Sequence, residues 1–335
     1  MKLPSYFKDL LANIEPSQSY KNDQASGHAT LRRRLAADPD FGPIHVNTFL
    51  QGSYRRNTAI HPGKDVDIVV VTTLNPDRTT PADANSRLKK CLDKYHEKVA
   101  AQTRSFCVTL SYVTMDVVLA TSRQLVAEDA FFSWLRKAED LEKADAWAGH
   151  SLLIPDSDLG RWVETDPKRQ IAWTTELNAK CGGYFVPLVK MLKWWRQEAY
   201  SQPKYPKGYV LERIAGECVD VTVRDNAEGF VRLLEAIVQK FAGYAAAGLV
   251  PNLPDAGVAT HNVAHRLSAA DFSAFIKKVA DAAKVARAAL DEDSTSKSAE
   301  LWRKLFGQKF PAAPATTDAS FPPAPVRPNK PAGFA

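Results

Sequence analysis

Apolar positions recur at two different spacings along the chain, and each change of spacing marks a change of structure. In residues 4–37 the apolar side chains return every three or four positions, which predicts helices that end at Pro39. Residues 45–119 carry short apolar or alternating runs, the pattern of β-strands, with one polar helical segment between the last two runs. The pattern therefore predicts a mixed α/β (α+β) core that is preceded by helices.

The second half of the chain returns to the helical spacing. Two extended segments, 151–156 and 160–167, first follow a charged segment around residues 128–145 that is predicted to be helical. From Cys181 almost to residue 310, apolar residues then recur with the period of amphipathic helices. This stretch predicts four helices and a closing fifth.

These changes divide the chain into three parts. We expect residues 1–180 to hold the N-terminal helix and the mixed α/β core, and residues 181–310 to form a helical domain. Residues 311–335 contain seven of the 21 prolines of the chain and almost no apolar periodicity. Such a composition does not bury enough surface to offset its ordering entropy, so it predicts a disordered or polyproline-like tail.

The composition is that of an ordinary globular protein. Of the 335 residues, 45% are apolar and 24% are charged, which supports a sizeable core and argues against wholesale disorder. No apolar run reaches the ~20 residues that a membrane-spanning helix needs, and charges interrupt the start of the chain where a signal peptide needs its apolar centre. We therefore expect a cytoplasmic protein that does not cross a membrane.

Charge and cysteine content narrow the classes of partner. A net charge of +6 with a pI near 9.0 is mild, so it suits phosphate-bearing ligands without requiring a long nucleic acid as partner. Four cysteines stand far apart with no CxxC pair: Cys91, Cys107, Cys181 and Cys218. They predict buried free thiols rather than a disulfide framework or a cysteine zinc site.

Three aspartates carry the strongest chemical signal. Asp65 and Asp67 are two residues apart at the start of an apolar strand, so they project from the same face, and Asp116 alone interrupts a later apolar strand. Like charges at the start of a buried strand are costly unless a cation or a water-filled cleft faces them. Three convergent carboxylates on adjacent strands suit two Mg²⁺ ions that activate a hydroxyl and steady a leaving pyrophosphate.

A phosphate-binding turn precedes these acids at a fixed distance. Gly52 and Ser53 follow an apolar strand and precede an expected helix start, where backbone amides and a small hydroxyl can bind a phosphate. Eleven residues separate Ser53 from Asp65. A Gly-Ser pair or a DxD pair alone is a weak signal. The interpretation as a metal and phosphate site rests on the order of strand, Gly-Ser, DxD and later Asp.

In this order the residues resemble the polymerase-β-like nucleotidyltransferases, and more closely the bacterial CD-NTases, the cGAS/DncV-like nucleotidyltransferases of CBASS anti-phage systems. The similarity spans about residues 1–310, whereas the segment 123–149 is longer and more charged than the family leads us to expect. It is carried by the runs GSYRRNT, DVDIVV, MDVV, IPD followed by WxxTDP, LVKMLKWW, KGYxLE, NVA and WRKLFGQKF.

The resemblance implies a nucleotidyltransferase core packed on a helical domain, with the active site in the cleft between them. It implies a synthase that joins ribonucleoside triphosphates such as ATP and GTP into a cyclic di- or trinucleotide, cGAMP-like second messenger with release of pyrophosphate. Asp65, Asp67 and Asp116 would hold Mg²⁺ or Mn²⁺. The product would act on a downstream effector. The spacing itself distinguishes neither a cyclic from a linear product nor a 3′–5′ from a 2′–5′ linkage.

Nucleotide binding is assigned to a second group of residues: Gln51, Gly52, Ser53, Lys190, Lys193, Lys207 and Tyr209. Lys190 and Lys193 share one helical stripe, which by itself indicates a solvated face. The resemblance instead implies that these lysines hold the triphosphate of the donor nucleotide. Lys207 and Tyr209 could add a cation and a base-stacking ring, although Tyr209 equally suits a core position.

Several other residues have an ordinary and a functional interpretation. The arginines at 32–34 indicate a solvated helix face or a clamp on phosphates. His261 and His265 are spaced for a shared zinc ion but lack a third ligand. Trp162 suits packing or the framing of a nucleobase.

Two other functional classes stay open on the sequence. One is a linear oligonucleotide synthetase or another nucleotidyltransferase that modifies tRNA, protein or an antibiotic. The other is a catalytically idle nucleotide-binding scaffold that recruits partners through its tail. The tail ends in small residues around Phe334, which suits either an inert terminus or a carboxylate threaded into a narrow pocket. The resemblance implies a ubiquitin-transfer-like ligase that conjugates the chain through Ala335.

Overall fold

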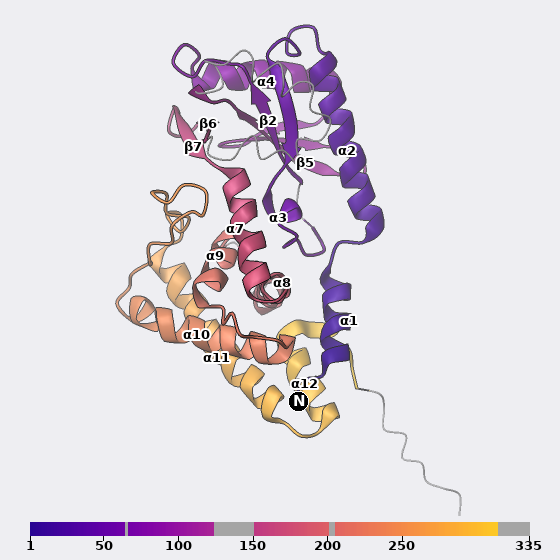
Figure 1. The fold of residues 1–335 in the computed structure, drawn as a ribbon, viewed down its shortest axis with the longest axis vertical. Helices are drawn as coiled ribbons and strands as arrows, with labels where there is room; N and C mark the ends of the chain where they lie inside the picture. Colours follow the sequence, from indigo (N-terminus) through magenta and orange to yellow (C-terminus); the bar gives the residue numbers. More distant parts are fainter. Residues whose placement is uncertain (64–65, 124–150, 201–204, 314–335) are drawn as a thin grey trace, which may run out of the picture.

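The computed structural model describes residues 1–63, 66–123, 151–200 and 205–313. A sheet with its helices forms one end of the molecule, and a group of helices forms the other (Figure 1). The predicted charged helix around 128–145, the acid Asp65 and nearly all of the proline-rich tail lie outside the described residues.

The first part is a mixed five-stranded sheet in the order β1-β2-β5-β4-β3. Strands β2 and β5 are parallel, and each of the other neighbouring pairs is antiparallel. The strands are β1 (His45–Leu50), β2 (Val66–Thr72), β3 (Val99–Ala101), β4 (Phe106–Thr109) and β5 (Thr114–Ala120). The sequence prediction of a mixed α/β core over residues 45–119 is confirmed.

Two helices cover one face of this sheet, α2 (Gln18–Ala37) and α4 (Pro81–Tyr95). They share a hydrophobic core with every second residue of β2, at Val66, Ile68 and Val70. Because side chains alternate along a strand, Asp67 projects from the opposite face. Asp67 is partly exposed, and all the remaining residues of β2 are buried.

A β-hairpin and a polar helix connect the two ends of the molecule. Strands β6 (Leu152–Asp156) and β7 (Arg161–Thr165) pair antiparallel, as predicted for the two extended segments. They are followed by α7 (Pro167–Lys180), whose first turn is capped by the side chain of Asp166. The sequence pattern did not predict α7, because only Pro167 and Thr174 of this helix are buried and its apolar contacts with the core come from partly buried side chains such as Trp173 and Leu177.

The second part, which we call the helical layer, contains α1 and the helices after Cys181. These later helices are α8 (Phe185–Ala199), α9 (Gly208–Cys218), α10 (Asn226–Ala246), α11 (Ala269–Asp291), α12 (Thr295–Phe306) and the short 3₁₀-helix η2 (Gly307–Lys309). Their apolar faces meet in one hydrophobic core with large aromatic residues such as Phe230, Phe272 and Trp302 at its centre. The five predicted helices are confirmed.

Helix α1 (Pro4–Ile14) packs on the helical layer although it precedes the sheet in the chain. Phe7 contacts Trp302 edge-on, with ring centroids 4.9 Å apart, and Phe310 at 5.2 Å. The chain therefore enters the molecule at the helical layer and crosses to the sheet before α2. The domain boundaries at residues 180 and 310 stay predictions.

Two further observations concern the sequence expectations. All four cysteines are free thiols, and Cys91 and Cys181 are buried. Burial raises the pKa of Cys91 to about 12, which suits an inert core residue. Within the described ranges, no helix is both long and apolar enough to cross a membrane.

Candidate active site

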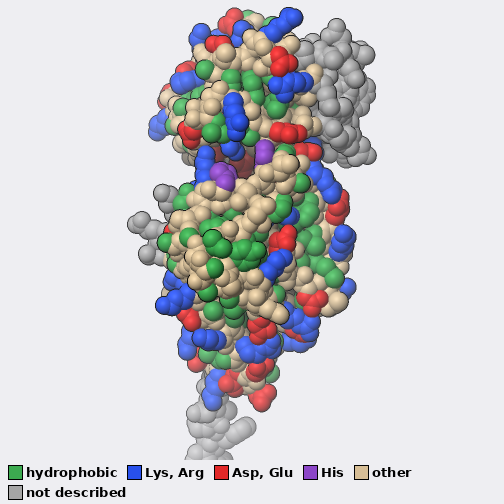
Figure 2. Space-filling model, turned by 90° about the vertical axis from the view of Figure 1, so that its left-hand side faces the viewer, with side chains coloured by type: hydrophobic (Ala, Val, Ile, Leu, Met, Phe, Trp, Pro, Cys, Tyr) green, Lys and Arg blue, Asp and Glu red, His purple; other side chains and the backbone are tan. Residues whose placement is uncertain are grey.

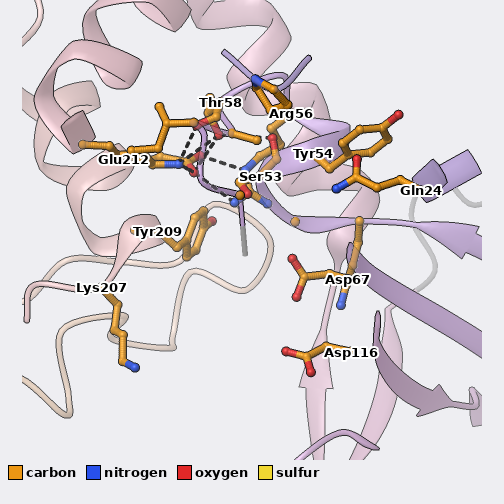
Figure 3. Close-up of a pocket in the computed structure, with 18 of the residues that line it drawn as sticks. Gln24, Ser53, Tyr54, Arg56, Thr58, Asp67, Asp116, Lys207, Tyr209 and Glu212 are labelled. Carbon is orange, nitrogen blue, oxygen red and sulfur yellow. Dashed lines mark hydrogen bonds and ion pairs between the residues drawn. The ribbon is translucent and has the colours of Figure 1, made fainter. Parts of the chain in front are cut away.

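The helical layer and the sheet enclose a pocket of about 460 Å³, within the range of small-molecule sites. The space-filling view shows a hollow in the surface between these two parts of the molecule (Figure 2). Residues of α2, the turn after β1, strands β2 and β5, and helices α7, α8 and α9 line the pocket. Figure 3 shows the side chains that carry its chemistry.

Asp67 and Asp116 lie side by side on the sheet edge of this pocket. They are register partners on the parallel strands β2 and β5, so their side chains leave neighbouring backbone positions on the same face. Both carboxylates point into the pocket (Figure 3). The amide of Gln102, in the turn between β3 and β4, donates a 3.0 Å hydrogen bond to Oδ1 of Asp116. The structure thus brings two of the three predicted acids together, and Asp65 lies outside the described residues.

The Gly-Ser turn packs directly against Asp67. Gly52 begins the short helix α3 (Gly52–Arg55) with a φ of +70°, a conformation that favours glycine. A Cβ at this position would stand 1.8 Å from Oδ2 of Asp67, so no side chain fits. The backbone N–H of Gln51 also donates to the carbonyl of Asp67 at 2.9 Å. These contacts fix Gln51, Gly52 and Ser53 in the pocket wall beside the acid.

The donor set on the sheet edge fits a divalent metal ion. Carboxylate oxygens are the ligands that Mg²⁺ prefers, and adjacent strands present two of them here. Among the residues that the structure describes, no group of three or more His, Cys, Asp and Glu side chains is close enough to hold a metal. The predicted third ligand, Asp65, belongs to the segment outside that description.

A buried charged cluster, made of Arg56, Thr58, Lys193 and Glu212, forms the wall opposite the acids. Glu212 is fully buried, and its Oε2 accepts from Nε of Arg56 at 2.8 Å. Its Oε1 accepts from Nζ of Lys193 at 2.7 Å and from the Thr58 hydroxyl at 2.8 Å. The cluster joins the loop after α3 to helices α8 and α9 (Figure 3).

The electrostatics of the buried charged cluster favour the charged forms of Glu212 and Arg56. Burial alone would raise the pKa of Glu212, but Arg56 and Lys193 outweigh burial and lower the pKa to about 2. Burial opposes the charge of Arg56 too, yet Glu212 outweighs it and the pKa of Arg56 is raised. Burial lowers the pKa of Lys193, and Glu212 opposes that shift. With all three groups ionised, the cluster carries one net positive charge.

The two predicted phosphate lysines are not on a solvated face. Lys190 is only 4% exposed, pairs with Glu15 at 2.7 Å and does not line the pocket. Lys193 is 5% exposed and lines the pocket as part of the buried charged cluster. The expectation of an exposed lysine stripe is therefore wrong, because Glu15, directly after α1, and Glu212 of α9 cover that side of α8 with their carboxylates.

Sequence reasoning missed Arg56 and Glu212 as parts of the pocket. Both stand in runs that the sequence analysis quoted, GSYRRNT and KGYxLE, but no single residue in either run signals a long-range ion pair. The pair joins residues 156 positions apart in the chain. Only the fold brings these two runs together.

Tyr209 and Lys207 occupy the helical side of the pocket. The ring of Tyr209 lies under the guanidinium of Arg56, with the guanidinium carbon 4.7 Å from the ring centroid. Its hydroxyl donates to Asp255 at 3.4 Å, and burial, followed by Asp255, raises the pKa of Tyr209. Lys207 is exposed at the start of α9 and points away from the buried charged cluster (Figure 3). The guanidinium of Arg56 thus covers one face of the Tyr209 ring, the ring predicted to stack on a base.

The remaining candidates have structural partners. Arg32 donates to Asn47 at 2.8 Å, and Arg34 donates to the carbonyl of Tyr95 at 3.0 Å, so these arginines tether α2 to the rest of the core. Trp162 donates to the carbonyl of Thr79 at 3.0 Å and does not line the pocket. In the described part of the chain, His261 and His265 belong to no candidate metal group.

Comparison with known proteins adds to this geometry. The Second Messenger Oligonucleotide or Dinucleotide Synthetase domain matches residues 1–127. A relative from Enterobacter hormaechei subsp. hoffmannii, named cyclic AMP-AMP-GMP synthase, is 39% identical over 352 residues, which cover 93% of this chain and 92% of the relative. A relative from an Acinetobacter species, named cyclic AMP-AMP-AMP synthase, is 36% identical over 363 residues, which cover 100% of this chain and 98% of the relative.

The fold agrees with the same group of proteins. The CD-NTase CdnG of Bradyrhizobium diazoefficiens, whose structure was solved in complex with GTP, superposes with a TM-score of 0.69 at 16% identity, over 92% of this chain and 96% of that chain. These comparisons confirm the predicted polymerase-β-like core on a helical domain and the predicted nucleotidyltransferase activity. Nucleotidyltransferases of this family generally use a divalent metal ion. This chain belongs to the bacterial CD-NTases, the nucleotidyltransferases that synthesise cyclic oligonucleotide second messengers.

Proposed function

We propose that this chain joins three ribonucleoside triphosphates, at least one of them ATP, into a cyclic trinucleotide. The paired carboxylates of Asp67 and Asp116 beside the Gly52–Ser53 turn are the observation that carries the chemistry. The names of the two relatives given above favour a ring of three nucleotides that contains adenine. We place the product, by the same resemblance, in anti-phage signalling through a downstream effector.

The residues of the pocket divide the work of each transfer. Asp67 and Asp116, together with Asp65, would hold Mg²⁺ or Mn²⁺, which supplies activation of the attacking hydroxyl and neutralises charge on the leaving pyrophosphate. The amides and hydroxyl of the Gly52–Ser53 turn bind phosphate oxygens of the donor nucleotide. The Gly52 contact with Asp67 keeps this turn at a fixed distance from the acids, so donor and acceptor stay aligned.

Each bond is formed by one substitution at phosphorus. A ribose hydroxyl attacks the α-phosphorus of the donor, the bond from that phosphorus to the β-phosphate bridging oxygen breaks, and pyrophosphate leaves. The hydroxyl proton passes to solvent or to a carboxylate of the pocket. Two such steps make a linear trinucleotide, and a third within that chain closes the ring with release of a third pyrophosphate.

The test is incubation with the four labelled ribonucleoside triphosphates and Mg²⁺ or Mn²⁺, followed by phosphatase and mass spectrometry. We expect a phosphatase-resistant product with the mass of a cyclic trinucleotide. A product that phosphatase digests would indicate a linear synthetase, and transfer to an added tRNA, protein or antibiotic would indicate another nucleotidyltransferase. Binding of nucleotide without any product would indicate a scaffold.

The partner predicted at the C-terminus stays a prediction. Conjugation through Ala335 by a ubiquitin-transfer-like ligase concerns residues outside those described, and the resemblance alone supports it. Intact-mass spectrometry of the protein from cells that carry the native operon tests it. We expect a higher-mass conjugate that is absent after deletion of residues 328–335, and unmodified chain alone would contradict the prediction.

A further inference from the structure

We propose that Arg56, and not Lys193, is a cation of the pocket wall that contacts the phosphates of a bound nucleoside triphosphate, and that Glu212 positions it. The inference rests on the proposed function for its ligand, because it assumes that a nucleoside triphosphate occupies the pocket. Both cations line that pocket, so the assignment depends on which of them has hydrogen-bond donors left for a ligand.

Lys193 has none left. An ammonium group has three N–H donors. Nζ of Lys193 lies 2.7 Å from Oε1 of Glu212, 3.0 Å from the carbonyl oxygen of Thr58 and 3.2 Å from the hydroxyl oxygen of Thr58. Three acceptors thus take its three protons, and a phosphate contact would require that the buried network breaks.

Arg56 has donors to spare. A guanidinium has five N–H donors in a planar fork, and Glu212 takes only two of them, one from Nε and one from Nη2. Within the described residues, no acceptor takes the other three, Nη1 keeps some accessible surface, and Arg56 lines the pocket. A planar fork with adjacent free N–H groups is the geometry that binds phosphate oxygens in pairs.

The surroundings of Arg56 hold it in one orientation. Glu212 grips one edge of the guanidinium through two hydrogen bonds, at 2.8 and 3.2 Å, and the ring of Tyr209 supports its face at 4.7 Å. The backbone N–H of Arg56 donates to the carbonyl of Gly52 at 3.1 Å, which links it to the phosphate-binding turn. A pre-positioned side chain loses little conformational freedom when a ligand binds.

The buried charged cluster also supplies positive charge for a phosphate. Arg56 and Lys193 share the single carboxylate of Glu212, at N···O distances of 2.8 and 2.7 Å, so the cluster keeps one net positive charge. Arg56 also lies close enough to Asp67 for their charges to interact, which places the cation near the reacting end of the pocket. A triphosphate lying between these residues would have its negative charge next to Arg56.

Two charge-matched variants separate the two cations. Arg56→Gln leaves the neutral Lys193–Glu212 pair, and Lys193→Met leaves the neutral Arg56–Glu212 pair, so each variant removes one positive charge and leaves one buried ion pair. The affinities of the full-length protein for ATP, ADP, AMP and adenosine are measured by calorimetry in EDTA. A smaller folded fraction lowers the apparent affinities for ATP and adenosine by the same factor, so the ratio of the two affinities does not depend on it.

We expect Arg56→Gln to lower the ratio of ATP to adenosine affinity by about tenfold or more, the loss of a hydrogen-bonded charge pair. The ratio of AMP to adenosine affinity should fall less. Lys193→Met should keep the ratio of ATP to adenosine affinity within about threefold of the wild type, because Lys193 makes no phosphate contact in the proposal. Equal loss of the ratio in both variants, a larger loss in Lys193→Met, or an unchanged ratio in Arg56→Gln would each overturn the assignment.

The wild type itself tests the proposed function separately. If the unaltered protein binds ATP no more tightly than adenosine, the proposed substrate fails and the assignment of Arg56 fails with it. If the wild type prefers ATP and the two variants behave in any of the three contrary ways, only the assignment fails. Arg56→Lys is the conservative variant, and we expect it to restore part of the lost ratio because it keeps the charge without the fork.

Discussion

Asp67 and Asp116 are register partners on the parallel strands β2 and β5, so two residues 49 positions apart present their carboxylates at one point of the sheet. The register follows from the local sequence. Each aspartate interrupts an apolar strand, and the parallel pairing aligns the two interruptions. Because the apolar residues on the opposite face of β2 are locked into the core, a shift of one residue would bury Asp67 there.

The first prediction concerns this pair. Asp67→Asn keeps the shape of the side chain and removes the charge that would hold a metal ion, so we expect the rate of synthesis to fall by about a thousandfold or more. Asp116→Asn should act in the same way. Product formation is measured with labelled triphosphates, and thermal unfolding shows that the fold persists. A variant that keeps a tenth of the wild-type turnover would contradict the assignment of Asp67 as a metal ligand.

Gly52→Ala tests the close packing of the phosphate-binding turn on Asp67. A Cβ there would stand 1.8 Å from the carboxylate, so either the turn or the acid must move. A displacement of about 1 Å between reacting groups costs about a hundredfold in rate, and we expect a loss of activity of that order. The measurement is turnover with labelled triphosphates, together with the free energy of unfolding.

The matched control for Gly52 is Gly160, in the turn between β6 and β7. It has nearly the same backbone conformation, φ +61° against +70°, and a Cβ there meets nothing within 4 Å. Gly160→Ala should therefore show only the conformational cost of about 1 kcal/mol and keep full activity. Equal activity loss in both variants would show that the backbone conformation, and not the contact with Asp67, explains the effect.

Lys190 gives a third prediction, which reverses the expectation from the sequence. It is buried and pairs with Glu15, so Lys190→Met should lower the free energy of unfolding by about 1 kcal/mol, a modest loss because Glu15 is partly exposed and can be hydrated. The KM for triphosphate should change by less than about threefold. Arg56→Gln is the positive control for KM. A large rise in KM with unchanged stability would restore Lys190 as a nucleotide-binding residue.

The helices and strands were predictable where residues close together in the chain carry the signal. The strand period around Asp67, the apolar runs of α8 to α11 and the glycine at position 52 each signal their structure within a few residues. Helix α7 gives no such signal, because it buries only two residues. A polar helix of this kind is stabilised by its cap and its neighbours, which the local pattern does not contain.

The site was predictable only in part for a related reason. Helical periodicity places Lys190 and Lys193 on one face of α8, but it does not say what covers that face. A lysine face is ordinarily covered by solvent, yet here it is covered by the carboxylates of Glu15 and Glu212, which lie outside α8, 175 residues from Lys190 and 19 residues from Lys193. The role of Arg56 depends on the same long-range contacts, so it becomes visible only in the folded structure.

The last prediction concerns the pH dependence of stability that Glu212 creates. Its pKa is lowered from an ordinary value of 4.5 to about 2 in the folded protein. A carboxyl group with a lowered pKa adds stability that is fully present above the unfolded-state pKa and is lost as the pH falls through the folded-state pKa. Glu212→Gln should therefore be less stable than the wild type by about 3 kcal/mol at pH 7, and this difference should shrink between about pH 5 and pH 2.

Glu235→Gln is the matched control for this measurement. Glu235 pairs with Arg287 at 2.9 Å, but both side chains are more than two-fifths exposed, so the pair contributes less than about 1 kcal/mol. Its difference from the wild type should stay small across the same pH range. The free energy of unfolding is measured in urea at each pH. If the deficit of Glu212→Gln is as small as that of Glu235→Gln, or persists unchanged at pH 2, then the buried charged cluster does not hold Glu212 ionised, and the orientation of Arg56 must have another cause.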